Sequence, residues 1–260
     1  MNSPRLRSKA KSWWRDCRSS LVVSLTLALT LPSVAGAPPD TTPNPGSIPP
    51  SGSSTDEPLV AGNPDGSNKI SAAMDLPPDL ASLAQAGKDE FHKGNYREAE
   101  RIFEKVLAKA PNSLYTMSNL GVVYFRGQKF KRAEAMFKKA IEIAPGDEFV
   151  HCTLGIVYYS QQKYDEAVSE LTKAMAVNPK NATAHNYLGI TASQKGWPEA
   201  AQKELESAIS LDPTYADAHF NLAVVFATQK HPNKEKAGEH YQRAMELGME
   251  PDTAMEQMIK

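Results

Sequence analysis

The sequence repeats itself every 34 residues, and this period constrains the fold more than any other feature. The stretch Leu114–Pro145 recurs one period later in a stretch that ends at Pro179, and weaker copies end at Pro111 and Pro213. Internal repeats of 20–50 residues are typical of arrays in which each unit buries its apolar face against its neighbour. The chain therefore predicts a modular array whose core grows unit by unit.

Each repeat has the pattern of two helices. In the first unit, apolar residues at helical spacing predict a helix A over about 80–93 and a helix B that reaches about Ala110. Gly94 and Asn95 supply the turn between them, and Asp79 is the expected N-cap of the first helix. Proline lacks the N–H that a helix interior needs, so the proline near the end of each unit marks the boundary to the next.

A second pattern indicates the kind of array. Positions 4, 7, 8, 11, 20, 24, 27 and 32 of the best unit hold Met117, Leu120, Gly121, Tyr124, Ala133, Phe137, Ala140 and Pro145. The next unit holds His151, Leu154, Gly155, Tyr158, Ala167, Leu171, Ala174 and Pro179. In these residues the chain resembles the tetratricopeptide repeat family. Small residues at positions 8, 20 and 27 would let helix B lie close against helix A.

The resemblance implies an all-α fold, a right-handed superhelical solenoid of five tetratricopeptide-type helix pairs plus a C-terminal capping helix. The five units are residues 80–113, 114–147, 148–181, 182–215 and 216–251. Unit 182–215 has Ala192 in place of the aromatic, and the turn of the fifth unit is two residues longer. Residues 252–260, with Met255 and Met258, are predicted to cover the last exposed face, as arrays require.

The first 36 residues have the pattern of an export signal. Six basic residues precede the uncharged run Leu21–Leu31, and small residues around Gly36 suit cleavage there. The run has 11 residues, whereas a spanning helix needs about 20. We expect export to the periplasm or cell envelope and no integral membrane span after cleavage. Secretion, or an uncleaved N-terminal anchor, is the alternative. After cleavage Cys152 would be the only cysteine, which excludes a disulfide within the chain.

Residues 37–79 form a predicted linker. Of these 43 residues, 20 are Pro, Gly or Ser and none is aromatic. Such a segment cannot bury enough apolar surface to offset the entropy of ordering. We therefore expect a disordered spacer in front of the repeat domain.

Composition and motifs argue against an enzyme and against a nucleic-acid partner. After residue 36 the chain keeps 29 − 6 = 23 basic and 30 − 1 = 29 acidic residues, a net charge of −6, whereas nucleic-acid binding needs a basic face. The sequence has no glycine-rich phosphate loop, nucleophile elbow or His-Glu-x-x-His motif. We therefore expect a non-catalytic protein with no cofactor.

Three histidines share position 4 of successive units, at His151, His185 and His219. Equivalent positions on packed helices are about 8–10 Å apart, whereas zinc ligands must all lie about 2 Å from the metal. The spacing therefore argues against a shared metal site and favours a packing role. Among the other histidines, His240 shows no convergent partner in the sequence.

The resemblance places a ligand site on the concave wall, which this family forms from positions 2, 5, 9, 12 and 13 of the A helices. We call the residues carried over to this wall the A-helix wall: Lys88, Phe91, Tyr115, Val122, Phe125, Arg126, Phe149, Ile156, Tyr159, Asn186, Ile190, Gln194, Phe220 and Val224. Burying one apolar side chain contributes roughly 1.5–3 kcal/mol, and a micromolar complex needs about 8 kcal/mol. Several wall residues would therefore have to engage a ligand together. The alternative is that they pack against one another or against the linker.

The resemblance implies a non-catalytic scaffold that binds a protein or peptide, as an envelope assembly or adaptor factor. The family's two-carboxylate clamp for chaperone C-termini is not assembled. Asn119 and Asn221 match its shared asparagine, but Ala84, Phe149 and Thr153 stand at flanking places. A heat-shock chaperone partner is therefore disfavoured. The alternative function is a self-associating structural spacer, a homo-oligomer whose groove is filled by its own chain.

Overall fold

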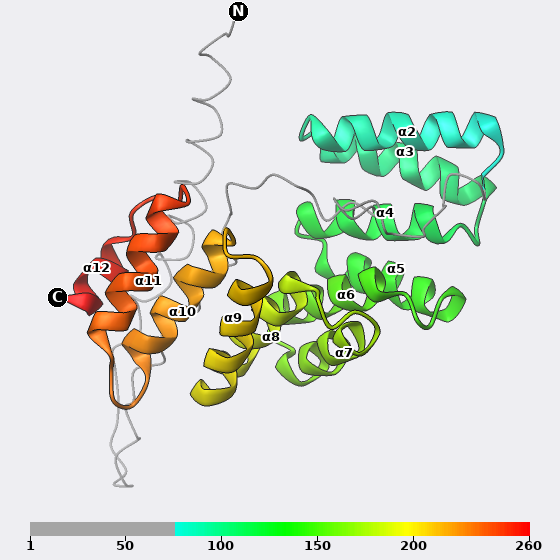
Figure 1. Ribbon diagram of the computed structural model, residues 1–260. Coiled ribbons are helices and arrows are strands. Elements are labelled where there is room, and N and C mark those ends of the chain that lie inside the picture. Colours follow the sequence, from blue (N-terminus) through cyan, green and yellow to red (C-terminus); the bar gives the residue numbers. More distant parts are fainter. Residues whose placement is uncertain (1–75) are drawn as a thin grey trace, which may run out of the picture. The chain divides into compact units, whose positions relative to one another are not determined.

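The computed structural model describes residues 76–260 (Figure 1). The predicted signal peptide and residues 37–75 of the predicted linker lie outside this part. Within it the regular elements are all helices, in agreement with the predicted all-α fold. They are α2 (Pro78–His92), α3 (Tyr96–Lys109), α4 (Leu114–Arg126), α5 (Phe130–Ile143), α6 (Glu148–Ser160), α7 (Tyr164–Val177), α8 (Ala182–Gln194), α9 (Pro198–Leu211), α10 (Ala216–Thr228), α11 (Lys234–Glu246) and α12 (Thr253–Ile259).

The helices form five consecutive A–B pairs, α2–α3 to α10–α11, that stack in chain order (Figure 1). Each A helix contacts its own B helix, and each B helix contacts the A helix of the next pair. Successive A helices also contact one another, whereas none of the described B helices contacts the next B helix. The A helices therefore lie on the inner side of the stacked pairs.

Small residues set the distance within each pair. A Cβ added to Gly121 would lie 2.7 Å from Phe137 Cζ, and one added to Gly155 would lie 2.6 Å from Leu171 Cγ. Gly189 stands in the same relation to Leu205, at 2.6 Å. The glycine at position 8 thus makes room for the large residue at position 24, as the packing argument from the sequence requires.

The helix ends follow local backbone chemistry, with one correction to the predicted start. The first helix begins at Pro78 with Pro77 as N-cap, and Asp79 lies inside its first turn. Proline is suited to this place because the first helical N–H groups have no partner within the helix. The side chains of Ser113, Asp147 and Asn181 cap α4, α6 and α8, each accepting a bond from a backbone N–H three residues later.

Four A–B turns share one left-handed residue at position 15. These residues are Gly94 (φ 79°), Gln128 (φ 58°), Gln162 (φ 61°) and Gly196 (φ 73°). Glycine adopts this conformation without steric cost, and other residues do so only rarely. The two glutamines therefore hold strained positions that glycine holds in the sister units.

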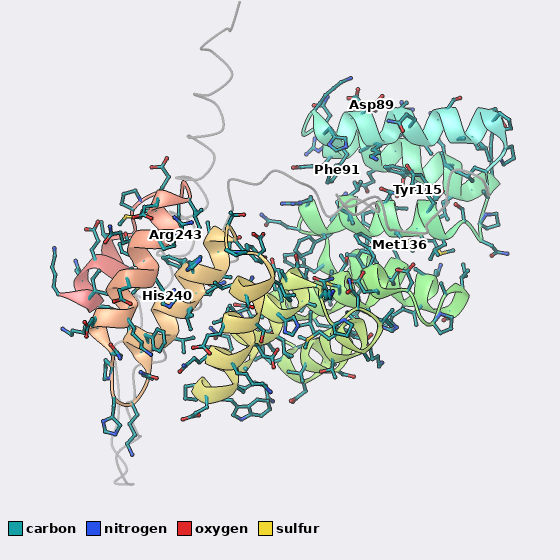
Figure 2. The ribbon with its side chains drawn as sticks, in the orientation of Figure 1. Asp89, Phe91, Tyr115, Met136, His240 and Arg243 are labelled. Atoms are coloured by element: carbon teal, nitrogen blue, oxygen red, sulfur yellow. The ribbon has the colours of Figure 1, made fainter. Side chains whose placement is uncertain are left out.

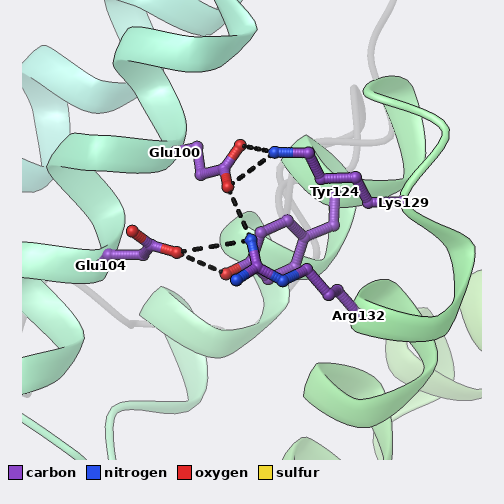
Figure 3. Close-up of polar contacts among 5 residues, drawn as sticks. All are labelled: Glu100, Glu104, Tyr124, Lys129 and Arg132. Carbon is purple, nitrogen blue, oxygen red and sulfur yellow. Dashed lines mark hydrogen bonds and ion pairs between the residues drawn. The ribbon is translucent and has the colours of Figure 1, made fainter.

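Ion pairs join the first three units at equivalent places. Glu100 of α3 binds Lys129 Nζ at 2.5 Å and Arg132 at 2.9 Å (Figure 3). In the same cluster, Tyr124 Oη donates to Glu104 at 2.8 Å. One unit later, Glu134 of α5 binds Lys163 Nζ at 2.8 Å. Position 21 of one unit is thus paired with position 16 of the next.

The chain ends in a cap. Met255 of α12 is fully buried, whereas Met258 is exposed. The helix contacts α10 and α11, and Asp252 N donates to Tyr241 Oη at 2.6 Å. No helix within residues 76–260 is both long and apolar enough to cross a membrane.

Candidate binding surface on the A helices

The residues of the A-helix wall lie on five inner helices. Lys88 and Phe91 lie on α2, and Tyr115 lies on the neighbouring α4; Figure 2 labels Phe91 and Tyr115. The remaining wall residues lie on α4, α6, α8 and α10. Since successive A helices contact one another, the predicted residues share one continuous face. Whether they bind a ligand stays a prediction.

Burial divides the wall into two sets. The first is buried within the protein: Phe91, Val122, Ile156, Tyr159, Asn186 and Ile190. The second keeps part or most of its surface accessible: Lys88, Tyr115, Phe125, Arg126, Phe149, Gln194, Phe220 and Val224. Val122 and Ile156 are only 1% and 0% exposed, so they support the wall from below. The second set holds the side chains that a ligand could reach.

A shallow depression marks the N-terminal end of this face. Lys88, Phe91 and Val122 line it together with Asn119, and Phe103 and Val123 complete it. It leaves no room for even a water-sized molecule between these side chains, whereas typical small-molecule sites hold roughly 300–1,000 Å³. The depression is therefore a slight indentation of the surface and not a preformed pocket.

Aromatic pairs accompany the wall in the first three units. The ring of Phe125 lies 5.8 Å from that of Phe130, and the Tyr159 and Tyr164 rings are 5.9 Å apart. Phe91 pairs with Tyr96 in the same way, at 5.4 Å. The B-helix partners Tyr96, Phe130 and Tyr164 were not predicted from the sequence. Their separation by 34 residues was the signal that could have found them.

The C-terminal half of the wall is more polar. Asn221 Nδ2 donates to Asn186 Oδ1 at 2.9 Å, and Asn186 Nδ2 donates to Tyr215 Oη at 3.2 Å. Asn221 is almost fully buried, and its Oδ1 has no hydrogen-bond partner among the described residues. Burial raises the pKa of Tyr215 well above its usual range, so this hydroxyl stays protonated. The cluster is a buried polar contact between α8 and α10 beneath the wall surface.

The position-4 histidines make no metal site but do make specific contacts. His151 Nδ1 lies 2.6 Å from Glu170 Oε2, and His185 Nδ1 lies 2.7 Å from Glu204 Oε2. Within residues 76–260, no group of three or more potential ligands is placed to hold a metal. The expectation that His240 lacks a partner is wrong, since its Nδ1 lies 3.1 Å from His219 Nδ1.

Cys152 lies on the inner helix α6 and is a free, buried thiol. Burial, followed by the charge of Glu148, raises its pKa well above the usual range. A reactive cysteine needs accessible thiolate, so the structure favours a packing role.

Comparison with known proteins agrees with this architecture. Residues 79–146 match the family model described as "Tetratricopeptide repeat", and residues 155–196 and 193–230 match the one described as "TPR repeat". None of the curated proteins compared with the chain matches it.

Solved structures match over most of the described residues. PilF of Pseudomonas aeruginosa is 20% identical with a TM-score of 0.62, covering 69% of this chain and 80% of that one. MamA of Desulfovibrio magneticus RS-1 is 20% identical with a TM-score of 0.59, covering 66% and 96%. YrrB, described as "a TPR protein with an unusual peptide-binding site", is 22% identical with a TM-score of 0.52, covering 66% and 87%. At these identities the likeness shows the fold alone, an array of helical repeats.

Proposed function

Because the chain belongs to the tetratricopeptide repeat family, we propose that it is a non-catalytic scaffold that binds a protein or peptide along the A-helix wall. The observation that carries the proposal is the set of accessible aromatic side chains on three of the inner helices, α4, α6 and α10. These are Tyr115, Phe125, Phe149 and Phe220. Aromatic residues are enriched in protein interfaces because they bury large area at low entropic cost.

The wall suits a ligand that spans several units. Each buried aromatic contributes roughly 1.5–3 kcal/mol, part of which offsets the cost of ordering the ligand. The accessible members of the wall extend from Lys88 on α2 to Phe220 and Val224 on α10. A peptide in contact with both ends would pass the central aromatic residues on its way.

The proposal includes export and a role as an assembly or adaptor factor in the cell envelope. It is supported by the basic segment, apolar run and small residues within positions 1–36 of the sequence. N-terminal sequencing of the protein isolated from its native cells tests the cleavage after Gly36. Recovery of an intact N-terminus would contradict it.

Binding is tested with Tyr115→Ser combined with Phe149→Ser. Both side chains are partly accessible, so the double variant should keep its helicity. Affinity capture of the full chain from the native envelope, followed by mass spectrometry, identifies a ligand. Peptides of that ligand are then titrated by fluorescence anisotropy, and the double variant should bind at least about tenfold more weakly, the effect of losing about 1.4 kcal/mol.

The matched control changes accessible apolar residues outside the wall. Ile143 and Val177 end the B helices α5 and α7 and are 44% and 53% exposed. Ile143→Ser with Val177→Ser should leave peptide affinity unchanged. Equal loss of binding in both double variants would overturn the A-helix wall as the binding surface.

One observation favours the alternative function, a self-associating spacer. Ile143, Val177 and Leu211 occupy the same position in three successive units and are all exposed. A row of exposed apolar residues can mark an interaction surface. In the spacer case, light scattering would show a mass that rises with concentration, and Ile143→Ser with Val177→Ser would abolish that rise.

A further inference from the structure

In each of three units, the histidine at position 4 of helix A contacts both the end of the preceding unit and helix B of its own unit. Its Nε2 meets the carbonyl oxygen of the proline that closes the preceding unit, at 2.8 Å for His151, 3.1 Å for His185 and 3.3 Å for His219. Its Nδ1 lies within hydrogen-bond distance of the side chain at position 23 of the unit, which belongs to helix B. That side chain is Glu170 in α7 and Glu204 in α9.

The last unit departs from this scheme. After the turn that is two residues longer, the equivalent B-helix position holds His240 instead of glutamate. The Nδ1 atoms of His219 and His240 are 3.1 Å apart, and the ring centroids are 5.3 Å apart. His240 also stacks on Phe226 of α10, at 5.8 Å between centroids. In the last unit a histidine–histidine pair thus occupies the place that a histidine–carboxylate contact occupies in each of the two sister units.

The proton positions in the pair follow from the partners. A carbonyl oxygen only accepts, so His219 Nε2–H donates to Pro213 O and leaves the Nδ1 of the neutral ring as an acceptor. The bond between the rings then needs Nδ1–H on His240 as donor. One added proton leaves a bond in place, because a protonated ring can still donate its Nδ1–H to the Nδ1 of a neutral partner. When both rings are protonated, both Nδ1 atoms are donors and the bond is lost. Protonation of a histidine beside a carboxylate has the opposite effect, because the cation is attracted.

From this geometry we infer that His219 and His240 form an acid-sensitive latch that holds α11 against α10. The latch is closed as long as one of the two Nδ1 atoms can accept, and it opens when both rings are protonated. The junctions built on Glu170 and Glu204 lack this property. Acidification therefore loosens one defined end of the array and leaves the preceding pairs in place.

The charges around the pair support this direction. Burial lowers the pKa of His219, against the bond to Pro213, and Arg243 lowers it further while Asp212 raises it. Burial also lowers the pKa of His240, followed by the charge of His219 and that of Lys236, against Glu239 of α11 and Glu206 of α9. Figure 2 places His240 and Arg243 on the same helix, α11. The charges of Asp252, the N-cap of α12, and of Glu256 within α12 act on Tyr241 instead.

The sign of the pH dependence follows. A histidine whose pKa is lower in the folded than in the unfolded state binds fewer protons when folded, so its contribution to stability is present above the unfolded pKa of about 6.5 and is lost as pH falls through it. The latch is coupled to the A-helix wall, since the Phe220 ring lies 6.3 Å from that of Tyr241 on α11. Opening α11 would therefore remove support from one wall residue.

Hydrogen exchange of the full chain, resolved by peptide, tests the latch without any ligand. Protection factors for residues 234–246 should fall about fivefold or more between pH 7 and pH 5, the change expected for loss of one hydrogen bond. Residues 198–211, which carry the Glu204 contact, serve as the internal control and should change less. No selective loss in residues 234–246 would overturn the inference.

Two substitutions separate the latch from general acid weakening. His240→Glu recreates the arrangement of the sister units and should abolish the selective loss at pH 5. Glu204→His is the reverse exchange and should create the same acid sensitivity in residues 198–211. If His240→Glu keeps the wild-type pH response, the pair is not the sensor. Should Glu204→His unfold the protein at pH 7, the His240→Glu result decides alone.

Discussion

At the scale of single residues, equivalent positions of the repeat units adopt the same backbone conformation with different side chains. Gln128 and Gln162 adopt the left-handed conformation that Gly94 and Gly196 adopt in sister turns. The glycines at position 8 are a second example, because each lies where a Cβ would meet the large residue of helix B. Both features make definite predictions about substitution.

Gln162→Gly should stabilise the protein by about 0.5–1 kcal/mol. Relief of the left-handed conformation, about 1–2 kcal/mol for a residue with a Cβ, exceeds the added entropy of glycine in the unfolded chain, about 0.4–1 kcal/mol. Urea unfolding measures the difference. Gln229→Gly is the control, since Gln229 has φ −63° and only the entropic cost applies there. A lower stability for Gln162→Gly would contradict the strain argument.

Gly155→Ala should destabilise the protein by about 1–3 kcal/mol, the usual range for overpacking. The new Cβ would lie 2.6 Å from Leu171 Cγ and 3.2 Å from the Leu171 backbone nitrogen, so the backbone of α7 has to move. Gly146→Ala is the matched control, because a Cβ there has no neighbour within 4 Å. Thermal unfolding of both variants tests the contrast, and equal effects would refute it.

At the scale of helices, the junctions between units combine apolar stacking with a few buried polar contacts. Glu134 of α5 is the best-connected example, since it accepts from Lys163 at 2.8 Å and from Gln161 at 3.1 Å. Burial acts to raise the pKa of Glu134, but the bonds from Lys138, Lys163 and Gln161 outweigh it and lower the pKa to about 2. The carboxylate is therefore ionised wherever the protein is folded.

Protonation of Glu134 should lower the free energy of unfolding in acid. Its folded pKa of about 2 lies below the ordinary value, so its contribution is complete above about pH 4.5 and is lost as pH falls toward 2. After solvent screening of the accessible lysines we expect about 1–2 kcal/mol. Glu134→Gln should flatten this part of the stability profile in urea titrations between pH 5 and 2.5. A wild-type slope in the variant would exclude Glu134 as a source.

The sequence predicted the helix pairs well because their determinants are local and repeated. Leu120-Gly121, Ala133 and Ala140 fix one pair on their own, and the period copies it. The accessibility of the wall could not be predicted, because Val122 and Phe125 look equally apolar in sequence, and their burial depends on which neighbouring side chains pack over them. The partner of His240 was predictable in principle. Once the two added turn residues are counted, His240 aligns with Glu170 and Glu204.

At the scale of the whole repeat domain, stability depends on contacts between neighbours, so a terminal unit needs a cover. The last face is covered by α12, whose Met255 is fully buried against the domain. The capping helix α12 is short. Its contact with the rest of the domain includes this side chain and the bond between Asp252 N and Tyr241 Oη.

Met255→Ala should cost about 2–5 kcal/mol, the range for deleting a buried large side chain, and should loosen unit 216–251 first. Met258→Ala, at an exposed position of the same helix, should have little effect. Hydrogen exchange locates the loss, and light scattering reports association through the uncovered face. Uniform loss of protection across all units would show that the cap acts on the whole domain at once.

The ion pairs between units have a consequence for how an array of this kind can change in length. Glu100 and Lys129 are separated by the same 29 residues as Glu134 and Lys163. A duplicated segment 114–147 would therefore bring its own Lys129 to the Glu134 of the first copy and present a second Glu134 to Lys163. This ion pair would re-form at the boundary between the two copies with no compensating substitution. One contact between neighbouring units is thus preserved when the array is lengthened by tandem duplication of this segment.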